Sequence, residues 1–273
     1  MDLVFSDLDG TLFHSRTYSW EAAEPALRLL RRRDTPLIFS SSKTRAEMEL
    51  LRKRLANRHP FIVENGGAVF IPQHYFPFEV PGARIVDGYE VLEFGERYQV
   101  VVDTLLVASY ESGCRVRGFY DMNAEQIGLR CGLPLAQAVL AKQREYDEPF
   151  EIVDSSSARV RRLLGAIEDH GKRWTRGGRF YHIHGDADKS FCVRVLTDLY
   201  RSARGPVRSL GLGDHWNDFE FLKTVDEAVV IRSPSAEELA WSIPGARVTD
   251  RPGPAGWNEA VTEWVGGAVM AYR

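Results

Sequence analysis

The sequence predicts an α/β protein with a doubly wound parallel-sheet (Rossmann-like) core and an inserted α+β domain. Short apolar runs with polar endings alternate with amphipathic helical patterns at the start of the chain, as is typical of a parallel sheet. This rhythm is lost between about residues 81 and 185 and returns after Gly185. The chain has 273 residues, 44% of them hydrophobic, which is enough for two domains.

The first part of the chain has the order β-α-β-α-β. Pro25 is expected to open the first helix, and Ser42 to cap the second helix, at residues 43–56. The last strand follows a double glycine and is expected to return as a hairpin. The predicted strands are residues 3–6 (LVFS), 35–42 (TPLIFSSS), 61–67 (FIVENGG) and 68–72 (AVFIP).

The middle segment combines short strands with helical patterns at residues 133–146 and 157–171. Its strands carry polar and aromatic residues, so we expect one face of its sheet to meet a polar surface. The later core elements are predicted as a helix at 188–203, a strand at 207–214, a helix at 216–225, a strand at 227–232 and a closing helix at 254–272. The predicted domains are therefore residues 1–80 and 186–273 for the core and 81–185 for the insert.

Composition narrows the class of partner. With 35 basic and 38 acidic residues, the net charge of −3 does not predict nucleic-acid binding. No apolar run approaches the ~20 residues of a membrane span, and MDLVFSDLDG does not resemble a signal peptide. The cysteines at 114, 131 and 192 form no CxxC pair. We therefore expect reduced thiols and a cytoplasmic location.

Acidic, amide and hydroxyl residues stand at or just after the ends of the predicted strands, and Lys189 opens the helix before the fourth of these strands. Ligands of a doubly wound sheet bind beyond the carboxyl ends of its strands, so we expect these residues to gather at one edge. Acids as close as those in DLDG repel each other unless a cation lies between them. The residues are Asp7, Asp9 and Gly10; Ser40, Ser41 and Ser42; Glu64 and Asn65; Lys189; and Asp214, Asn217 and Asp218.

This group of oxygen atoms predicts a magnesium site that also handles phosphate. Mg²⁺ is usually held by one or two carboxylates plus phosphate oxygens, so Asp7 and Asp214 are expected to bind it, and Asp9 through its carbonyl. Asp7 is expected to attack phosphorus, and Asp9 to act as general acid and then base. The expected phosphate-binding groups are Gly10, Lys189 and one of Ser40, Ser41 and Ser42, of which Ser41 is favoured.

Each of these groups also has a structural interpretation. Asp7 and Asp9 would fit a strand-end turn, and Asp214 and Asp218 would fit helix caps. Lys189 would fit a solvated helix end. The functional interpretation is favoured because four strand ends together supply a complete set of catalytic partners.

Four motifs resemble those of the haloacid dehalogenase superfamily of phosphatases, namely DLDGT (7–11), the serines at 40–42, Lys189 and GDHWND (213–218). The insert is similar to the large α/β caps of one subgroup. The resemblance implies Asp7 as nucleophile and Asp9 as acid/base. It also implies that Asp7, Asp9 and Asp214 bind Mg²⁺, supported by Asp218 and its neighbour Asn217. The chain departs from many relatives in having Ser190, where they have glycine, after Lys189.

Within this superfamily, the stretches at 39–49, 62–72 and 132–150 are similar to mannosyl-3-phosphoglycerate phosphatases. The resemblance implies hydrolysis of mannosyl-3-phosphoglycerate to mannosylglycerate, a compatible solute, under a mobile cap that selects the substrate. Sucrose-phosphate or a hexose phosphate would suit the same chemistry as a substrate. The residues would also suit a phosphosugar mutase, or a sugar-phosphate sensor without catalytic activity.

Several side chains have a functional interpretation only as substrate-binding residues. Arg144 and Glu148 are expected to contact the glycerate carboxylate and the sugar hydroxyls, or else to form a plain helix end with a salt bridge. Lys43 would lie near an anion, or in a solvated first turn. Glu64 and Asn65 would bind substrate or shape a turn, and His182 and His184 are expected on a strand face or hinge rather than at a metal. The expected partner is a small phosphorylated sugar derivative.

Overall fold

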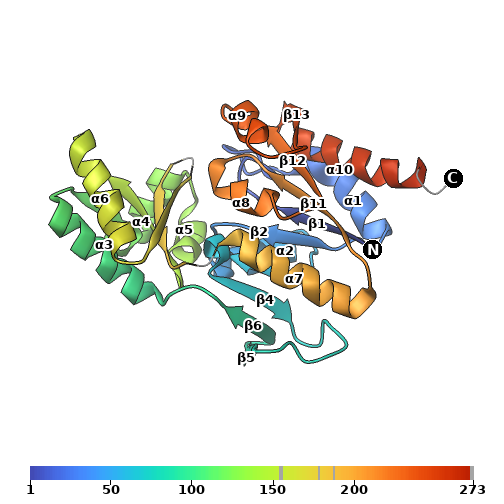
Figure 1. Ribbon diagram of the computed structural model, residues 1–273, viewed down its shortest axis with the longest axis horizontal. Helices are drawn as coiled ribbons and strands as arrows, with labels where there is room; N and C mark the ends of the chain where they lie inside the picture. The colour runs from blue at the N-terminus through green and yellow to red at the C-terminus, as the bar shows by residue number, and fades with distance from the viewer. Residues whose placement is uncertain (154–155, 178, 187, 271–273) are drawn as a thin grey trace.

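The computed structural model describes residues 1–153, 156–177, 179–186 and 188–270, and two β-sheets organise this part of the chain (Figure 1). The larger sheet has nine strands in the order β13-β12-β11-β1-β2-β3-β4-β6-β5 within these residues. The strands are β1 (Asp2–Ser6), β2 (Leu37–Ser40), β3 (Phe61–Val63), β4 (Ala68–Pro72), β5 (Arg84–Val86), β6 (Tyr89–Glu93), β11 (Arg208–Gly213), β12 (Glu227–Arg232) and β13 (Arg247–Pro252).

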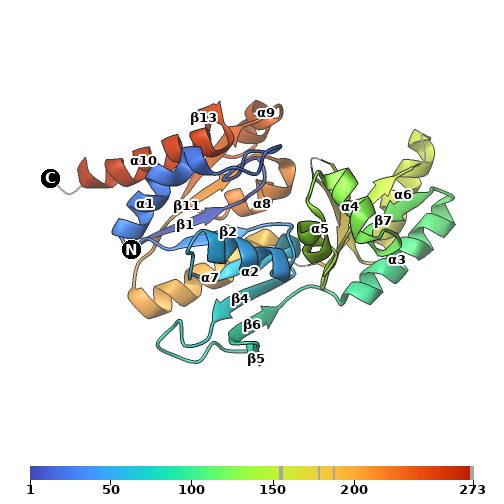
Figure 2. The same ribbon diagram turned by 180° about the vertical axis from the view of Figure 1, so that it is seen from behind.

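The strands from β13 to β3 run parallel, and β4, β6 and β5 continue the sheet in antiparallel pairs. Residues 68–72 return as the predicted hairpin, with Phe61 opposite Phe70. Helices cover both faces (Figures 1 and 2). One face carries α1 (Glu24–Arg32), α2 (Arg45–Arg54) and α10 (Gly253–Met270), and the other carries α7 (Lys189–Arg204), α8 (Phe219–Leu222) and α9 (Ala236–Trp241). The predicted doubly wound core is confirmed.

The smaller sheet has the antiparallel order β7-β8-β10-β9, with β7 (Val116–Gly118), β8 (Asp147–Ile152), β9 (Arg173–Arg176) and β10 (Tyr181–His184). Its own core joins this sheet to α3 (Tyr98–Ser112) and α6 (Ser157–Asp169). A second apolar cluster holds α4 (Ala124–Cys131) and α5 (Leu135–Ala141). Figure 1 shows this unit as a separate lobe beside the larger sheet. The predicted α+β insert is confirmed, and we call it the cap.

The structure corrects several predicted boundaries. β5 and β6 pair with β4 in the larger sheet, so a cap that starts at residue 81 begins too early. We propose the boundary near residue 95, because α3 is the next element. The predicted helix at 133–146 is the shorter α5, which spans Leu135–Ala141. The closing helix is α10, and residues 271–272 of its predicted range lie outside the described residues.

The N-cap residue of helix α2 (Arg45–Arg54) also differs from the prediction. Thr44, not Ser42, precedes the helix, and its Oγ1 accepts the backbone N–H of Glu47 at 3.2 Å. The Glu47 carboxylate accepts the Thr44 N–H in return. This reciprocal capping box satisfies two backbone donors, and residues 41–43 form a loop between the strand end and the helix.

In the described part of the chain, no helix combines the length and the apolar character needed to cross a membrane. The three cysteines are buried, and none forms a disulfide within the described residues.

Candidate active site

Asp7 directly follows β1 and is 6% exposed. Its backbone N–H donates to Leu212 in β11, which fixes the strand end. Gly10 then turns the chain with φ of +87°. A Cβ at Gly10 would lie 2.4 Å from Asp214 Oδ2, so only glycine allows the loop to approach this carboxylate.

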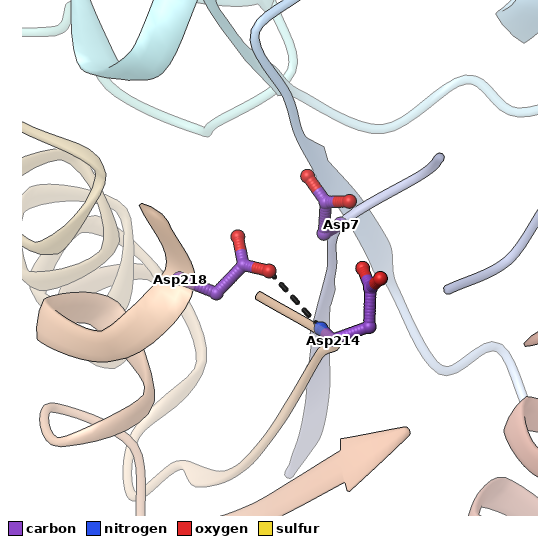
Figure 3. A group of neighbouring side chains, drawn as sticks. All are labelled: Asp7, Asp214 and Asp218. Carbon is purple, nitrogen blue, oxygen red and sulfur yellow. Dashed lines mark hydrogen bonds between the residues drawn. The ribbon is translucent and has the colours of Figure 1, made fainter. Parts of the chain in front are cut away.

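Asp7, Asp214 and Asp218 converge at the carboxyl ends of β1 and β11. Each offers an oxygen atom within 4.8 Å of the others, and Figure 3 shows the three side chains gathered around one space. Lys189, at the start of α7, donates to Asp7 Oδ1 at 2.8 Å and to Asp218 Oδ1 at 2.7 Å. We call these four residues the carboxylate cluster.

Neighbouring donors orient the acids of this cluster. Thr11 Oγ1 donates to Asp214 Oδ1 at 2.9 Å. Asp218 Oδ2 accepts the backbone N–H groups of Asp214 and His215. Both oxygens of Asp218 are therefore bound within the protein, whereas Asp7 and Asp214 line the pocket.

The electrostatics of the cluster favour a cation. Burial, and next Asp218, raise the pKa of Asp7 to about 7 in spite of Lys189. Burial, and next Asp7, raise the pKa of Asp214 well above its ordinary value. Oδ1 of Asp9 is buried without a hydrogen-bond partner in the described residues. Crowded carboxylates and an unpartnered oxygen fit a hard divalent ion such as Mg²⁺.

Asp9 Oδ2 pairs with Lys43 Nζ at 2.7 Å. Lys43 also lies 3.8 Å from Glu47 and over the ring of Tyr18, at 5.4 Å from its centroid. Burial by itself would lower the pKa of Lys43, but Asp9 and Glu47 outweigh burial and raise it. The structure therefore puts Lys43 beside an acid of the site rather than in a solvated turn.

The serines at the end of β2 separate into two kinds. Ser41 and Ser42 line the pocket, as do Gly10 and Asn217. Ser40 does not line it, and its buried hydroxyl has no partner in the described residues. The side chain of Ser41 accepts the backbone N–H of Lys43 at 3.3 Å, which leaves its own O–H available as a donor.

Glu64, Asn65, Arg144, Asp147 and His182 form a second buried group, which we call the junction cluster because it joins β3 to the cap. Three consecutive backbone N–H groups, at 145–147, donate to the Glu64 carboxylate. Arg144 pairs with Asp147 and lies 3.5 Å from Glu64. Asn65 Nδ2 donates to Asp147 at 2.6 Å, and His182 Nδ1 lies 2.9 Å from the same oxygen.

The two acids of the junction cluster titrate differently. Burial would raise the pKa of Asp147, but Arg144 and His182 outweigh it and hold this pKa below its ordinary range. Burial raises the pKa of Glu64 to about 7, because Arg144 and the backbone donors offset burial only in part. Glu64 and Asn65 thus contact the cap directly, a role that the sequence pattern did not indicate.

Glu148 lies inside the cap rather than on the pocket wall. Its carboxylate accepts the Tyr98 hydroxyl at 2.6 Å and the Tyr120 N–H at 3.1 Å. Burial raises its pKa to about 7 despite these hydrogen bonds. His184 Nδ1 donates to the Gly185 carbonyl, so the strand-face interpretation fits His184, whereas His182 lines the pocket.

The carboxylate cluster opens into a pocket of about 260 Å³ between the larger sheet and the cap. Several residues around this pocket were not predicted from the sequence, because most of them belong to no recognisable motif. Thr11 alone had a local signal, because it follows the DLDG turn. The missed residues are Thr11 beside the cluster, Tyr18 and Glu47 on the core side, and Phe119, Cys131, Arg179 and Phe180 on the cap side.

Comparisons with known proteins agree with this geometry. A family model described as haloacid dehalogenase-like hydrolase matches residues 4–77. A protein of Methanococcoides burtonii, named glucosyl-3-phosphoglycerate/mannosyl-3-phosphoglycerate phosphatase, is 40% identical over 265 residues, which cover 97% of each chain. A mannosyl-3-phosphoglycerate phosphatase of Pyrococcus horikoshii is 37% identical over 232 residues, 85% of this chain and 90% of that protein.

A similar solved structure is the sucrose-phosphatase of Synechocystis in complex with sucrose and phosphate. It has a TM-score of 0.61 and 13% identity, and 96% of each chain is covered. At this identity, the likeness shows a shared fold.

The parallel-sheet core, the inserted cap and the strand-end carboxylates define a hydrolase of the haloacid dehalogenase-like class. The chain belongs to the family of phosphatases in this class that includes the M. burtonii and P. horikoshii relatives. It is a phosphoric monoester hydrolase, and the family resemblance predicted from its motifs is confirmed.

Proposed function

We propose that this enzyme is a Mg²⁺-dependent phosphatase that converts mannosyl-3-phosphoglycerate to mannosylglycerate and inorganic phosphate through an aspartyl-phosphate on Asp7. The names of the relatives support the substrate. The observation that carries the mechanism is the position of Asp7, which lines the pocket and receives Lys189 on one oxygen only. Its second oxygen has no protein donor among the described residues and is the one that attacks phosphorus.

Two displacements make up the reaction. Asp7 forms a bond to phosphorus, the ester P–O bond breaks, and Asp9 gives its proton to the departing alkoxide. Asp9 then removes a proton from water, which attacks the aspartyl-phosphate and restores the Asp7 carboxylate. Both acids line the pocket. Ser41, Lys189 and the backbone at Gly10 hold the phosphate oxygens during both steps.

The proposed metal site consists of the Asp7 and Asp214 carboxylates and the backbone carbonyl of Asp9. Asp218 supports it indirectly, since Lys189 and two backbone N–H groups occupy its oxygens, and Asn217 stands beside it. When bound, Mg²⁺ would offset the repulsion between these acids and neutralise charge on the phosphate.

A substrate panel with product analysis tests this proposal. The purified enzyme is given Mg²⁺ and one of mannosyl-3-phosphoglycerate, glucosyl-3-phosphoglycerate, sucrose-phosphate or hexose phosphates. We expect the highest kcat/KM for a glycosyl-3-phosphoglycerate, with free phosphate as the product. A preference for sucrose-phosphate or a hexose phosphate would contradict the substrate, and an isomerised phosphate ester would indicate a mutase.

We also propose a cytoplasmic location, supported by three buried cysteines outside disulfides in the described residues. The check is the redox state of these thiols, all three of which should react with a maleimide after unfolding without a reductant.

A further inference from the structure

Among the described residues, three arginine and lysine side chains line the pocket: Lys43, Arg144 and Arg179. Carboxylates of the protein already neutralise two of them. Lys43 pairs with Asp9 and Glu47. Arg144 pairs with acids of the junction cluster. Arg179 is the one of the three for which the described residues supply no such acid.

Each nitrogen of the Arg144 guanidinium already has an acceptor within the protein. Its side chain is 3% exposed. Nη2 pairs with the Asp147 carboxylate, Nε donates to the Asp147 carbonyl at 3.0 Å, and Nη1 donates to the Ser42 carbonyl at 3.0 Å. The protein's own acidic groups therefore already offset the charge of Arg144, a pairing that the sequence pattern did not indicate.

Arg179 is in a different situation. It belongs to the turn between β9 and β10 and is exposed within the cap. Nη1 donates to the Cys131 carbonyl, and no carboxylate pairs with its guanidinium in the part of the chain that the structure describes. Its charge is therefore available to an anion in the pocket.

The contacts of Arg179 bring it to the catalytic side of the pocket. The Cys131 carbonyl that accepts from Arg179 also accepts the Tyr18 hydroxyl, at 3.3 Å. Lys43 lies over the Tyr18 ring and pairs with Asp9. Asp7 and Asp9 thus share one pocket with Arg179, which lines it from the cap side.

We propose that Arg179 binds the carboxylate of the glycerate group and selects phosphorylated substrates that carry it, an inference that rests on the proposed function. In mannosyl-3-phosphoglycerate, the carboxylate and the glycosidic oxygen are on the carbon next to the phosphate-bearing one. With the phosphate at Asp7, the proposed pose directs this carboxylate toward Arg179 on the cap side of the pocket. A guanidinium presents paired donors that match the two oxygens of a carboxylate. A substrate with a neutral group in that place would leave the charge of Arg179 unpaired.

The test compares two substrates with three enzymes. The substrates are mannosyl-3-phosphoglycerate and its primary amide, in which an uncharged amide group replaces the carboxylate. The enzymes are the wild type, Arg179→Gln and the control Arg176→Gln. Arg176 is on the same hairpin and is exposed, with its guanidinium over Tyr181, and it does not line the pocket.

We expect the wild type and Arg176→Gln to prefer the acid over the amide by about 10- to 100-fold in kcat/KM, as befits a charge-assisted hydrogen bond. Arg179→Gln should prefer it by less than about 3-fold, with the loss mainly in KM for the acid. A variant that keeps the wild-type preference overturns the inference, as does one that loses the same factor on both substrates.

The same experiment distinguishes failure of the proposed function from failure of this inference. If the wild type hydrolyses neither glycerate ester but does hydrolyse another sugar phosphate, the substrate is wrong and the inference falls with it. If the wild type hydrolyses the acid and amide equally well, the substrate stands and the carboxylate subsite does not.

Discussion

The carboxylate cluster and the junction cluster are both buried and both combine acids with a base, but their charges are matched to different degrees. In the carboxylate cluster, Lys189 faces three aspartates, and the nearby Asp9 keeps an oxygen without a partner in the described residues. In the junction cluster, every carboxylate oxygen has a donor.

This difference separates a site that binds a ligand from a structural contact. A buried acid without sufficient donors raises its pKa or recruits a cation, and the pKa of Asp7 is raised to about 7. A buried acid surrounded by donors, like Asp147, keeps its charge and holds two segments together. The pKa of Glu64 in the junction cluster is also raised to about 7, so neither burial nor a raised pKa by itself identifies an active site. The distinguishing feature is a carboxylate oxygen without a donor, among the described residues, beside the pocket.

The largest effect is expected for Asp7→Asn. The amide cannot form the aspartyl-phosphate, so kcat should fall by about 10⁴-fold or more. The thermal unfolding midpoint of the metal-free protein should not fall, because one of three repelling acids is gone. Phosphate release and calorimetry measure these effects, and Asp103→Asn, an exposed acid on α3, is the control. Turnover near the wild-type rate would remove Asp7 as the nucleophile.

Substitutions in the junction cluster should lower the stability of the fold rather than remove a step of the reaction. Arg144→Met leaves Asp147 and Glu64 buried without their cation, so the free energy of unfolding should fall by about 3–5 kcal/mol in urea titrations. Arg84→Met removes an exposed pair with Glu93 and should change the midpoint little. A loss of less than about 1 kcal/mol for Arg144→Met would mean that the cluster does not depend on this charge.

Glu148 is a buried acid of a third kind, since it accepts hydrogen bonds only from neutral donors, the Tyr98 hydroxyl and the Tyr120 N–H. Its pKa rises from the ordinary 4.5 to about 7 on folding. Between these values the folded state holds a proton that the unfolded chain has released, so stability falls as pH rises through this window.

Glu148→Gln should remove that dependence. From pH 5 to pH 8, the variant should gain about 1–3 kcal/mol relative to the wild type, measured as the difference between their unfolding free energies. Parallel pH profiles for the two proteins would show that Glu148 is ionised throughout.

The smallest effect is expected for Thr11→Val, which removes the donor to Asp214 with little change of shape. We expect about a 10-fold weaker affinity for Mg²⁺, since Asp214 loses the group that orients it. The measurement is a Mg²⁺ titration of the unfolding midpoint, with Thr104→Val on α3 as the control. An unchanged affinity would mean that Asp214 is oriented without Thr11, or that it does not bind the metal.

The local pattern of residues was sufficient for the catalytic edge. Apolar runs with polar endings predicted β1, β2, β3 and β11, and parallel pairing brought Asp7 and Asp214 together at their carboxyl ends. The sequence also predicted that Lys189 would join them. These features depend on strand periodicity and on a general rule of sheet topology, both of which are visible along the chain.

The pattern of residues along the chain was enough to predict the doubly wound core, the insert and the polar groups at the strand ends. The three-dimensional arrangement was needed to show that β5 and β6 extend the core sheet and that Asp147 already pairs with Arg144. It also shows that Arg179 lines the pocket without a carboxylate partner in the described residues. These features could not be predicted because strand edges and cationic side chains pair with whichever groups lie close to them in the folded protein. Residues far apart in the chain compete for each charge, and only the folded protein shows which of them reaches it.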